Sequence, residues 1–166
     1  MNNNGIELKI DNKELKATLN GFGEAFHASK IKALKAGAMV LKKAAQQGFD
    51  SSGISNAPNP EYSDLIRDGI MMSKTDEVED KVKVHIMGTR NKKSGTFRLR
   101  FFENGTKDRY QTEVNGKALK KKRFIGKIPD GKYSFFNTAV DGASSNATST
   151  FESVLFTMID KAWNNT

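Results

Sequence analysis

The chain has 166 residues and a mass of 18.4 kDa, which is the size of one ordinary domain. It contains no cysteine, which excludes disulfides, thiolate metal sites and cysteine nucleophiles, and its two histidines are too few for a histidine-rich metal site. No apolar run reaches the roughly 18 residues that a membrane span needs, and the N-terminal residues do not resemble a signal peptide. We expect a soluble protein with one domain over residues 1–166, made in a cytoplasm and not associated with a membrane.

The formal net charge of +8 is concentrated in one segment. Residues 115–127 contain six basic side chains and no acid. These side chains, called the basic patch below, are Lys117, Lys120, Lys121, Lys122, Arg123 and Lys127. Because the excess is local, it indicates a charged surface rather than a property of the whole chain.

The N-terminal third predicts a short strand followed by helices. Ile6, Leu8 and Ile10 alternate with charged residues, as in a strand, and residues 11–14 resemble the capping box of a short helix. The strongest helical pattern covers about residues 24–47, with one bulky apolar face and one face of small residues. The small residues are Ala33, Ala36, Gly37, Val40 and Ala44. A helix with two such faces can pack against two neighbours at once.

The middle of the chain predicts two strands after a short helix. Residues 50–60 are rich in Ser, Asn, Gly and Pro and indicate a loop. A short helix is expected over about residues 61–72, followed by an acidic turn over 75–80. Apolar residues then alternate with polar or charged ones at 82–86 and again at 97–101, which predicts a strand at each place.

The last third predicts a hairpin and a final helix. Asn115-Gly116 is the best two-residue hairpin signal in the chain, because both central positions of such a turn need a positive φ. Residues 107–133 would then form an inserted or extended hairpin that carries the basic patch. Helical periodicity follows, breaks at residues 142–145 and continues over about 148–163.

The order of these elements predicts the fold class. Helices come first, strands follow and helices end the chain, without alternating strand–helix units. This order favours an α+β fold with an antiparallel sheet. A long N-terminal helix, a short helix and a C-terminal helix would pack on that sheet, and the basic hairpin would extend from it.

No motif for catalysis or cofactor binding is present. The chain lacks the Gly-x-x-x-x-Gly-Lys-Ser/Thr and Gly-x-Gly-x-x-Gly patterns. His27 falls on the bulky face of the long helix and His85 on the outward face of a strand, where neither has the surroundings of a catalytic base. The acids of residues 76–80 could hold a divalent cation, but they lack the spacing of an EF-hand loop, so a solvated turn is favoured. We predict that the protein is not an enzyme and needs no cofactor or metal.

The basic patch has three interpretations. It can be a solvated hairpin, it can contact the phosphates of nucleic acid, which needs lysines but no particular fold, or it can dock on an acidic protein surface. The aromatic residues nearby, Tyr110, Phe124 and Tyr133, are too scattered to predict a stacking platform. The sequence does not choose among the three.

Four segments in order carry a resemblance. They are the alanine- and lysine-rich helix of residues 31–45, the start of a short helix at 63–70, the Phe-Phe-Glu-Asn-Gly-Thr segment at 101–106, and the Phe-Phe pair within 134–139 that leads into the final helix. Together they resemble the head–tail joining, or tail-completion, proteins of long-tailed bacteriophages. The chain departs from that family in lacking prolines around the fourth segment and in the length of residues 107–133.

The resemblance implies a structural protein of the phage neck. Subunits would form a ring matched to the six-fold tail, complete the tail end, join it to the DNA-filled head and leave a channel for DNA. The partners implied are the head connector or stopper protein on one side and the tail terminator or tube protein on the other, with non-specific contact to genome DNA in the channel. The protein would be made in the host bacterial cytoplasm and end in the virion neck. The alternative, from another class, is a basic nucleic-acid-binding module.

Two groups of residues are candidate contacts between subunits, because a ring needs two different patches on each subunit. One is the small-residue helix face around Gly37. The other is a motif at the end of the predicted strand, and its residues are Phe102, Glu103, Asn104, Gly105 and Thr106. We expect an exposed aromatic ring there and a turn with positive φ at Gly105. The alternative for Phe102 is that its ring packs under the final helix.

Overall fold

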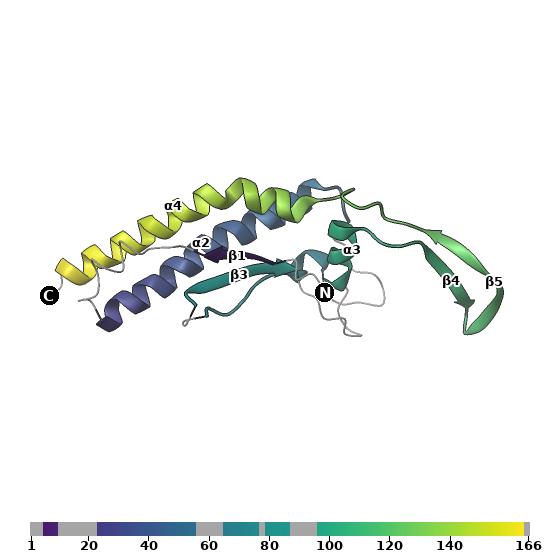
Figure 1. The fold of residues 1–166 in the computed structure, drawn as a ribbon, viewed down its shortest axis with the longest axis horizontal. Helices are drawn as coiled ribbons and strands as arrows, with labels where there is room; N and C mark the ends of the chain where they lie inside the picture. The colour runs from purple at the N-terminus through teal and green to yellow at the C-terminus, as the bar shows by residue number, and fades with distance from the viewer. Residues whose placement is uncertain (1–4, 10–22, 56–64, 77–78, 87–95, 165–166) are drawn as a thin grey trace.

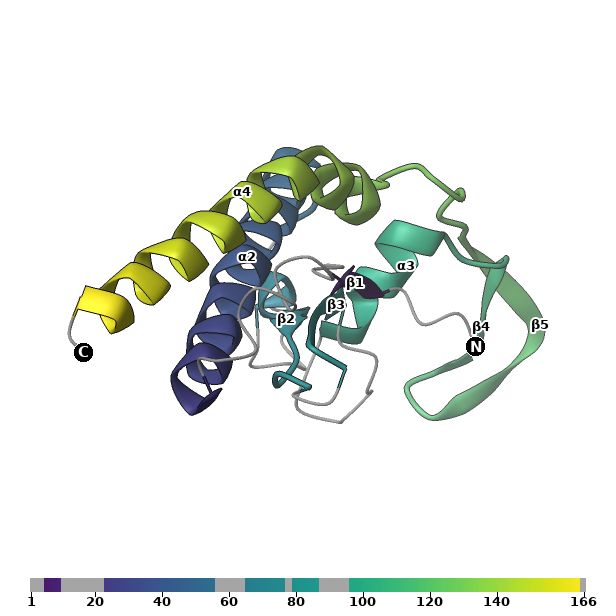
Figure 2. The same cartoon turned by 60° about the vertical axis from the view of Figure 1, so that its left-hand side comes forward.

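A computed structural model of the 166-residue chain describes residues 5–9, 23–55, 65–76, 79–86 and 96–164. Three layers form the body: a small sheet, a long helix on the sheet, and a second long helix on the first (Figure 1). A two-stranded hairpin extends from one end of this body (Figures 1 and 2). The fold is therefore α+β, as predicted, with the expected long, short and C-terminal helices and antiparallel sheets.

Helix α2 (Gly23–Ser51) forms the middle layer, and the predicted long helix is confirmed. Its bulky face enters the core through Leu34, Leu41 and Phe49, which are almost completely buried. The helix continues beyond residue 47, where the sequence predicted its end, because Phe49 in its last turn is fully buried in the core. Gly48 lets the backbone of α2 approach the next long helix closely. A Cβ atom at Gly48 would lie 2.8 Å from the Cβ of Ala139.

Helix α4 (Phe135–Asn164) runs antiparallel to α2 and packs along it (Figure 1). The predicted break at residues 142–145 is wrong, because the helix passes through them without interruption. A helical glycine costs only about 1 kcal/mol relative to alanine. The opposite face of α4 buries large side chains such as Phe136 and Phe151, and burying one phenylalanine contributes about 1.5–3 kcal/mol, which outweighs that cost.

The three-stranded sheet has the order β1-β3-β2, and both pairings are antiparallel. Strand β1 is Gly5–Lys9, β2 is Ile70–Met72 and β3 is Lys81–Ile86. The alternation predicted for β3 is confirmed, because Val82, Val84 and Ile86 are buried and the residues between them are half-buried. The sheet thus turns one apolar face of β3 toward α2.

Two expected elements differ from the prediction. The short helix expected over residues 61–72 is a 3₁₀ helix, η1 (Ile66–Gly69), in its described part, and β2 follows it directly. Residues 70–72 extend because they pair with β3. The short helix expected after residue 11 lies outside the described residues, as does the part of the expected helix before residue 65.

The strand expected at residues 97–101 is also wrong. The segment forms a 3₁₀ helix, η2 (Thr96–Arg98), and then the helix α3 (Leu99–Asn104). Leu99 and Glu103 are buried and Phe102 is half-buried, and this i, i+3, i+4 spacing is typical of a helix. Short apolar runs fit either period, and here the longer spacing decides the structure.

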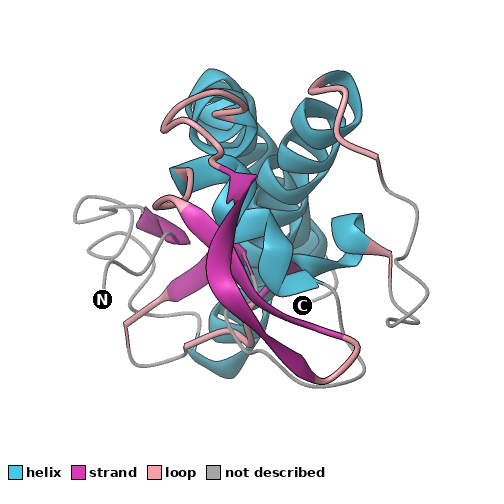
Figure 3. Ribbon diagram, turned by 90° about the vertical axis from the view of Figure 1, so that its right-hand side faces the viewer, coloured by secondary structure: helices cyan, strands magenta, loops and turns pink. Residues whose placement is uncertain are grey.

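The predicted hairpin of residues 107–133 is present. Strands β4 (Arg109–Val114) and β5 (Lys117–Gly126) pair antiparallel, and Figure 3 shows them as a twisted ribbon. The turn contains Asn115 with φ 51° and Gly116 with φ 74°, the two positive values that the sequence required. Within the described part of the chain, no helix is long and apolar enough to cross a membrane.

Candidate functional site: the projecting hairpin and its junction

The hairpin is the most exposed part of the described structure. Tyr110, Phe124 and Ile125 are each more than half exposed, and Val114 is 40% exposed. Neither strand makes an extensive contact with another described helix or strand. The rings of Tyr110 and Phe124 pair across the strands with centroids 5.6 Å apart, which stabilises the ribbon itself. Large apolar side chains therefore remain exposed on a surface that the other described helices and strands do not cover extensively.

All six side chains of the basic patch are exposed. Strands β4 and β5 together carry six basic residues and one acid, Glu113, a net charge of +5. The pairing changes register between Gln111, opposite Arg123, and Glu113, opposite Ala118. Residues 119–122 therefore face Thr112 alone. The lysine triplet (residues 120–122) lies in this irregularity, and such bulges redirect side chains from the regular alternation of a strand.

The motif at residues 102–106 forms the junction between the hairpin and the body. The backbone N–H of Thr106 donates to the carbonyl of Ile128 at 2.8 Å. The N–H of Ile128 donates in return to Oγ1 of Thr106 at 3.0 Å. These two bonds tie together the segment that enters β4 and the segment that leaves β5.

Gly105 is required at the junction by its conformation and its surroundings. Its φ is +69°, which confirms the predicted positive φ. A Cβ atom at this position would lie 2.8 Å from both the carbonyl oxygen of Ile128 and the amide nitrogen of Asp130. Any side chain here would thus push away the segment that leaves β5.

Glu103 connects the junction to α4. The residue is only 4% exposed, and its two carboxylate oxygens accept hydrogen bonds from the backbone N–H groups of Phe136 at 3.0 Å and Asn137 at 3.1 Å. Those N–H groups belong to the first turn of α4, where the helix has no carbonyl partners to offer them. A carboxylate at this end of a helix also interacts favourably with the helix dipole.

The other candidate contact residues divide into internal and surface positions. Phe102 is half-buried, and its ring contacts that of Tyr133 edge to face with centroids 5.6 Å apart. Asn104 is exposed and Thr106 is half-buried. Gly37 is buried inside α2 within a single chain. Phe102, Glu103 and Gly105 thus hold the hairpin on the body, and Asn104 is the member of the motif that faces solvent most fully.

The small-residue face of α2 meets α4 at an open groove. The groove has a volume of about 570 Å³. Its lining consists of Val40, Lys43, Ala44, Gln47, Ala139, Gly142, Ala143 and Asn146. The sequence correctly grouped Val40 and Ala44 on one face, and in the structure much of that face is occupied by the chain's own second long helix.

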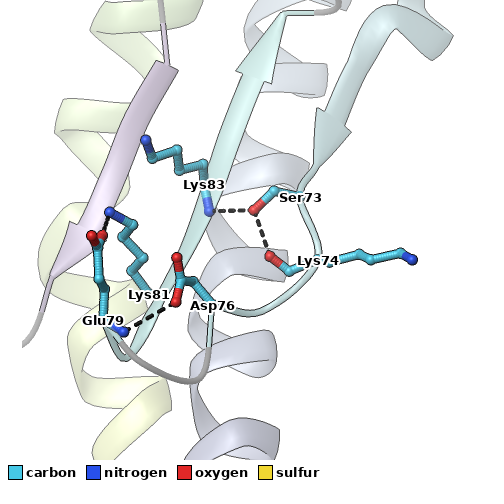
Figure 4. A network of polar contacts seen from close by, with 6 residues as sticks. All are labelled: Ser73, Lys74, Asp76, Glu79, Lys81 and Lys83. Carbon is cyan, nitrogen blue, oxygen red and sulfur yellow. Dashed lines mark hydrogen bonds and ion pairs between the residues drawn. The ribbon is translucent and has the colours of Figure 1, made fainter.

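The acidic turn between β2 and β3 is bonded internally. Figure 4 shows the Asp76 carboxylate accepting from the N–H of Glu79 at 3.1 Å, and the Glu79 carboxylate paired with Lys81. Asp80 pairs with Lys30 of α2 at 2.6 Å. Among the described residues no group of three or more acidic or histidine side chains is arranged to hold a metal ion. The Asp80 carboxylate thus helps to hold this turn on α2, and those of Asp76 and Glu79 stabilise the turn itself.

One exposed surface was not singled out from the sequence. Glu152, Phe156, Asp160 and Trp163 follow one another on α4 at spacings of four, four and three, and all are exposed. Phe156 is 52% exposed and Trp163 is 66% exposed. This surface, called the outer α4 face below, lies opposite the buried side of the helix. The helix predicted over residues 148–163 could have revealed this surface, because residues three and four apart lie on one face of a helix.

Comparisons with known proteins give no match for this chain, whether with protein-family models, curated proteins or solved structures. The candidate function therefore depends on the residues and on the geometry of the hairpin, its junction and the outer α4 face.

Proposed function

We propose that the chain is a structural protein of the bacteriophage neck, which forms a ring that completes the tail end and joins it to the DNA-filled head. The observation that carries the proposal is the projecting hairpin, which is held at its base by hydrogen bonds and makes no extensive contact with another described helix or strand. The four sequence segments that resemble tail-completion proteins, taken in their order, favour the phage neck as the assembly to which the protein belongs. The ring leaves a channel through which DNA passes.

The exposed hairpin supports an assembly role on physical grounds. A two-stranded hairpin alone in water is marginally stable, and this one also exposes an aromatic pair and an excess of positive charge. Exposed apolar side chains of this kind mark surfaces that bind a partner. The hydrogen bonds at Thr106 and the tight packing at Gly105 fix the root of the hairpin. The hairpin therefore presents its exposed side chains in a fixed direction relative to the body.

The buried carboxylate also supports a structural role. Glu103 is the buried acid of the described chain, and catalytic sites often use such a group. Here both of its oxygens are engaged by the first turn of α4. The function of this residue is to align the second long helix with the hairpin, which preserves the shape of the subunit.

The experiment is deletion of the gene in a phage that carries it. We expect DNA-filled heads and separate tails that lack this ring, seen by electron microscopy of the lysate. Addition of the purified wild-type protein should restore joined particles. Intact, infectious virions from the deletion would contradict the proposal.

A basic nucleic-acid-binding module is the second candidate, favoured by the net charge of +5 on β4 and β5. Phosphate contacts release counterions, so binding to duplex DNA should weaken steeply as salt rises. The test is the affinity of the purified chain for duplexes of arbitrary sequence across salt concentrations. Tight binding with a steep salt dependence, together with normal joining in the deletion phage, would favour this module over the neck protein.

A further inference from the structure

We propose that the hairpin of one subunit docks on the outer α4 face of a second copy of this chain. This inference rests on the proposed function in that it names the contact between neighbouring subunits of the ring. It concerns two exposed surfaces of the described part of the chain, the hairpin and the outer α4 face. Both surfaces combine exposed aromatic side chains with an excess of one sign of charge.

The hairpin supplies positive charge and apolar area. The lysine triplet lies where the strand pairing is irregular, so its side chains are free of regular cross-strand partners. Phe124 and Ile125 follow on the same strand, 56% and 53% exposed. Aromatic side chains are enriched at protein interfaces, and charged side chains around them steer the partner and fix its orientation.

The outer α4 face supplies the complement. Its aromatic residues, Phe156 and Trp163, alternate along the same side of the helix with two acids, Glu152 and Asp160. Helix α4 carries three acids and one lysine, a net charge of −2, whereas the whole chain carries +8. This is therefore a locally acidic surface on a basic protein, and a basic arm would be attracted to it.

The positions of the two surfaces require two copies. Figure 1 places the hairpin at one end of the long axis and the C-terminal half of α4 at the other. A hairpin cannot reach the α4 face of its own chain in this arrangement, but it can reach that of a neighbour. The two patches differ, so the contact is heterologous, and its repetition closes a ring when the rotation allows.

Two other occupants fit the observations less well. The groove between α2 and α4 is lined by Lys43, which would repel the basic patch. Nucleic acid would neutralise the hairpin but would leave the acidic outer α4 face and Phe156 exposed. Of the three occupants, a second copy accounts for both surfaces together.

The test is a charge-reversal cycle on the purified full-length chain. The hairpin variant is Lys120→Glu, Lys121→Glu and Lys122→Glu together; the helix variant is Glu152→Lys with Asp160→Lys; a third variant combines all five changes. Sedimentation velocity over a range of concentrations gives the dissociation constant. We expect each reversal to raise this constant by about tenfold or more, and the combined variant to recover most of the loss, because like charges face each other only in the single reversals.

A matched control separates the specific contact from net charge. Lys32, Lys35 and Lys43 are exposed on α2, and changing all three to Glu alters the net charge by the same amount as the hairpin variant. This control should assemble like the wild type. Far-ultraviolet circular dichroism and thermal unfolding confirm that every variant is folded.

The absence of cysteine from the chain allows a direct measure of proximity. A chain with Lys121→Cys, mixed with a chain with Phe156→Cys and oxidised, should give a disulfide-linked pair of different chains. Lys35→Cys mixed with Phe156→Cys should give far less.

The inference is overturned if the wild type stays monomeric at every concentration and no specific cross-link forms. It is also overturned if the combined variant associates no more tightly than the single reversals. A third contrary outcome is that the hairpin reversal removes duplex-DNA binding while the helix reversal changes neither assembly nor cross-linking. These outcomes would not refute the neck function, because the deletion phage tests that function separately. Conversely, if copies associate through these surfaces but phage without the protein still join heads to tails, the inference stands and the neck function is refuted.

Discussion

Replacement of Glu103 by alanine tests how the hairpin and α4 are held together. The change removes two hydrogen bonds from a carboxylate that is 4% exposed, and it leaves the N–H groups of Phe136 and Asn137 without those acceptors. A hydrogen bond to a charged group contributes about 1.5–3 kcal/mol, and loss of a helix N-terminal cap costs about 0.5–2 kcal/mol. Since the two bonds share one carboxylate and partly replace hydration, we expect a loss of about 3 kcal/mol in the free energy of unfolding.

The assay is thermal unfolding followed by circular dichroism. For a chain of this length, 1 kcal/mol shifts Tm by about 2–4 °C, so Glu103→Ala should lower Tm by about 6–12 °C. Glu103→Gln keeps one acceptor oxygen and should fall between the alanine variant and the wild type. Glu113→Ala, at an exposed position on β4, is the matched control and should change stability by less than about 0.5 kcal/mol. If Glu103→Ala and Glu113→Ala unfold at the same temperature, the carboxylate does not stabilise the junction as argued.

Three further predictions concern two pairs of glycines and the lysine triplet. Gly105→Ala should destabilise the protein by several kcal/mol more than Gly116→Ala. Both glycines have positive φ, but only Gly105 has backbone atoms 2.8 Å from the new Cβ. Equal losses in the free energy of unfolding, measured in urea, would mean that φ alone matters. Gly48→Ala should cost about 1–3 kcal/mol by forcing α2 away from α4. Gly142→Ala, which meets open space in a helix, should instead stabilise by up to about 1 kcal/mol, and the same sign for both would refute the close helix contact. The triple reversal of the lysine triplet should leave Tm within about 2 °C of the wild type, since exposed charges contribute little to stability.

Much of the fold follows from local patterns that tertiary contacts reinforce. The alternation at Val82, Val84 and Ile86 predicts β3 because one face of that strand is buried. Asn115-Gly116 predicts the hairpin turn because few other pairs adopt positive φ twice. In both cases local chemistry and the final structure demand the same conformation.

Other elements depend on contacts that the local sequence does not contain. The residues of β2 extend because β3 is there to pair with them, although their own sequence allows a helix. Leu99 and Phe101 fit the period of a strand, but burial at Leu99 and Glu103 selects a helix. Gly142 indicates a break in the helix, but packing against α2 keeps α4 continuous.

The sequence predicts where the candidate site lies, but not the role of each of its residues. The basic patch lies on an exposed hairpin, as its composition indicated. The role of Glu103 could not be foreseen, because the N–H groups that it accepts from are 33 and 34 residues away. Gly105 could be foreseen, since a glycine after asparagine indicates positive φ, but the backbone of Asp130 that crowds it could not.

The measurement that tests the central claim most directly is electron microscopy of virions in which this protein carries a tag that binds gold. The neck function predicts label confined to the junction between head and tail, arranged as a ring around the channel, on particles whose heads contain DNA. Virions without label, or label spread along the tail or over the head, would contradict it.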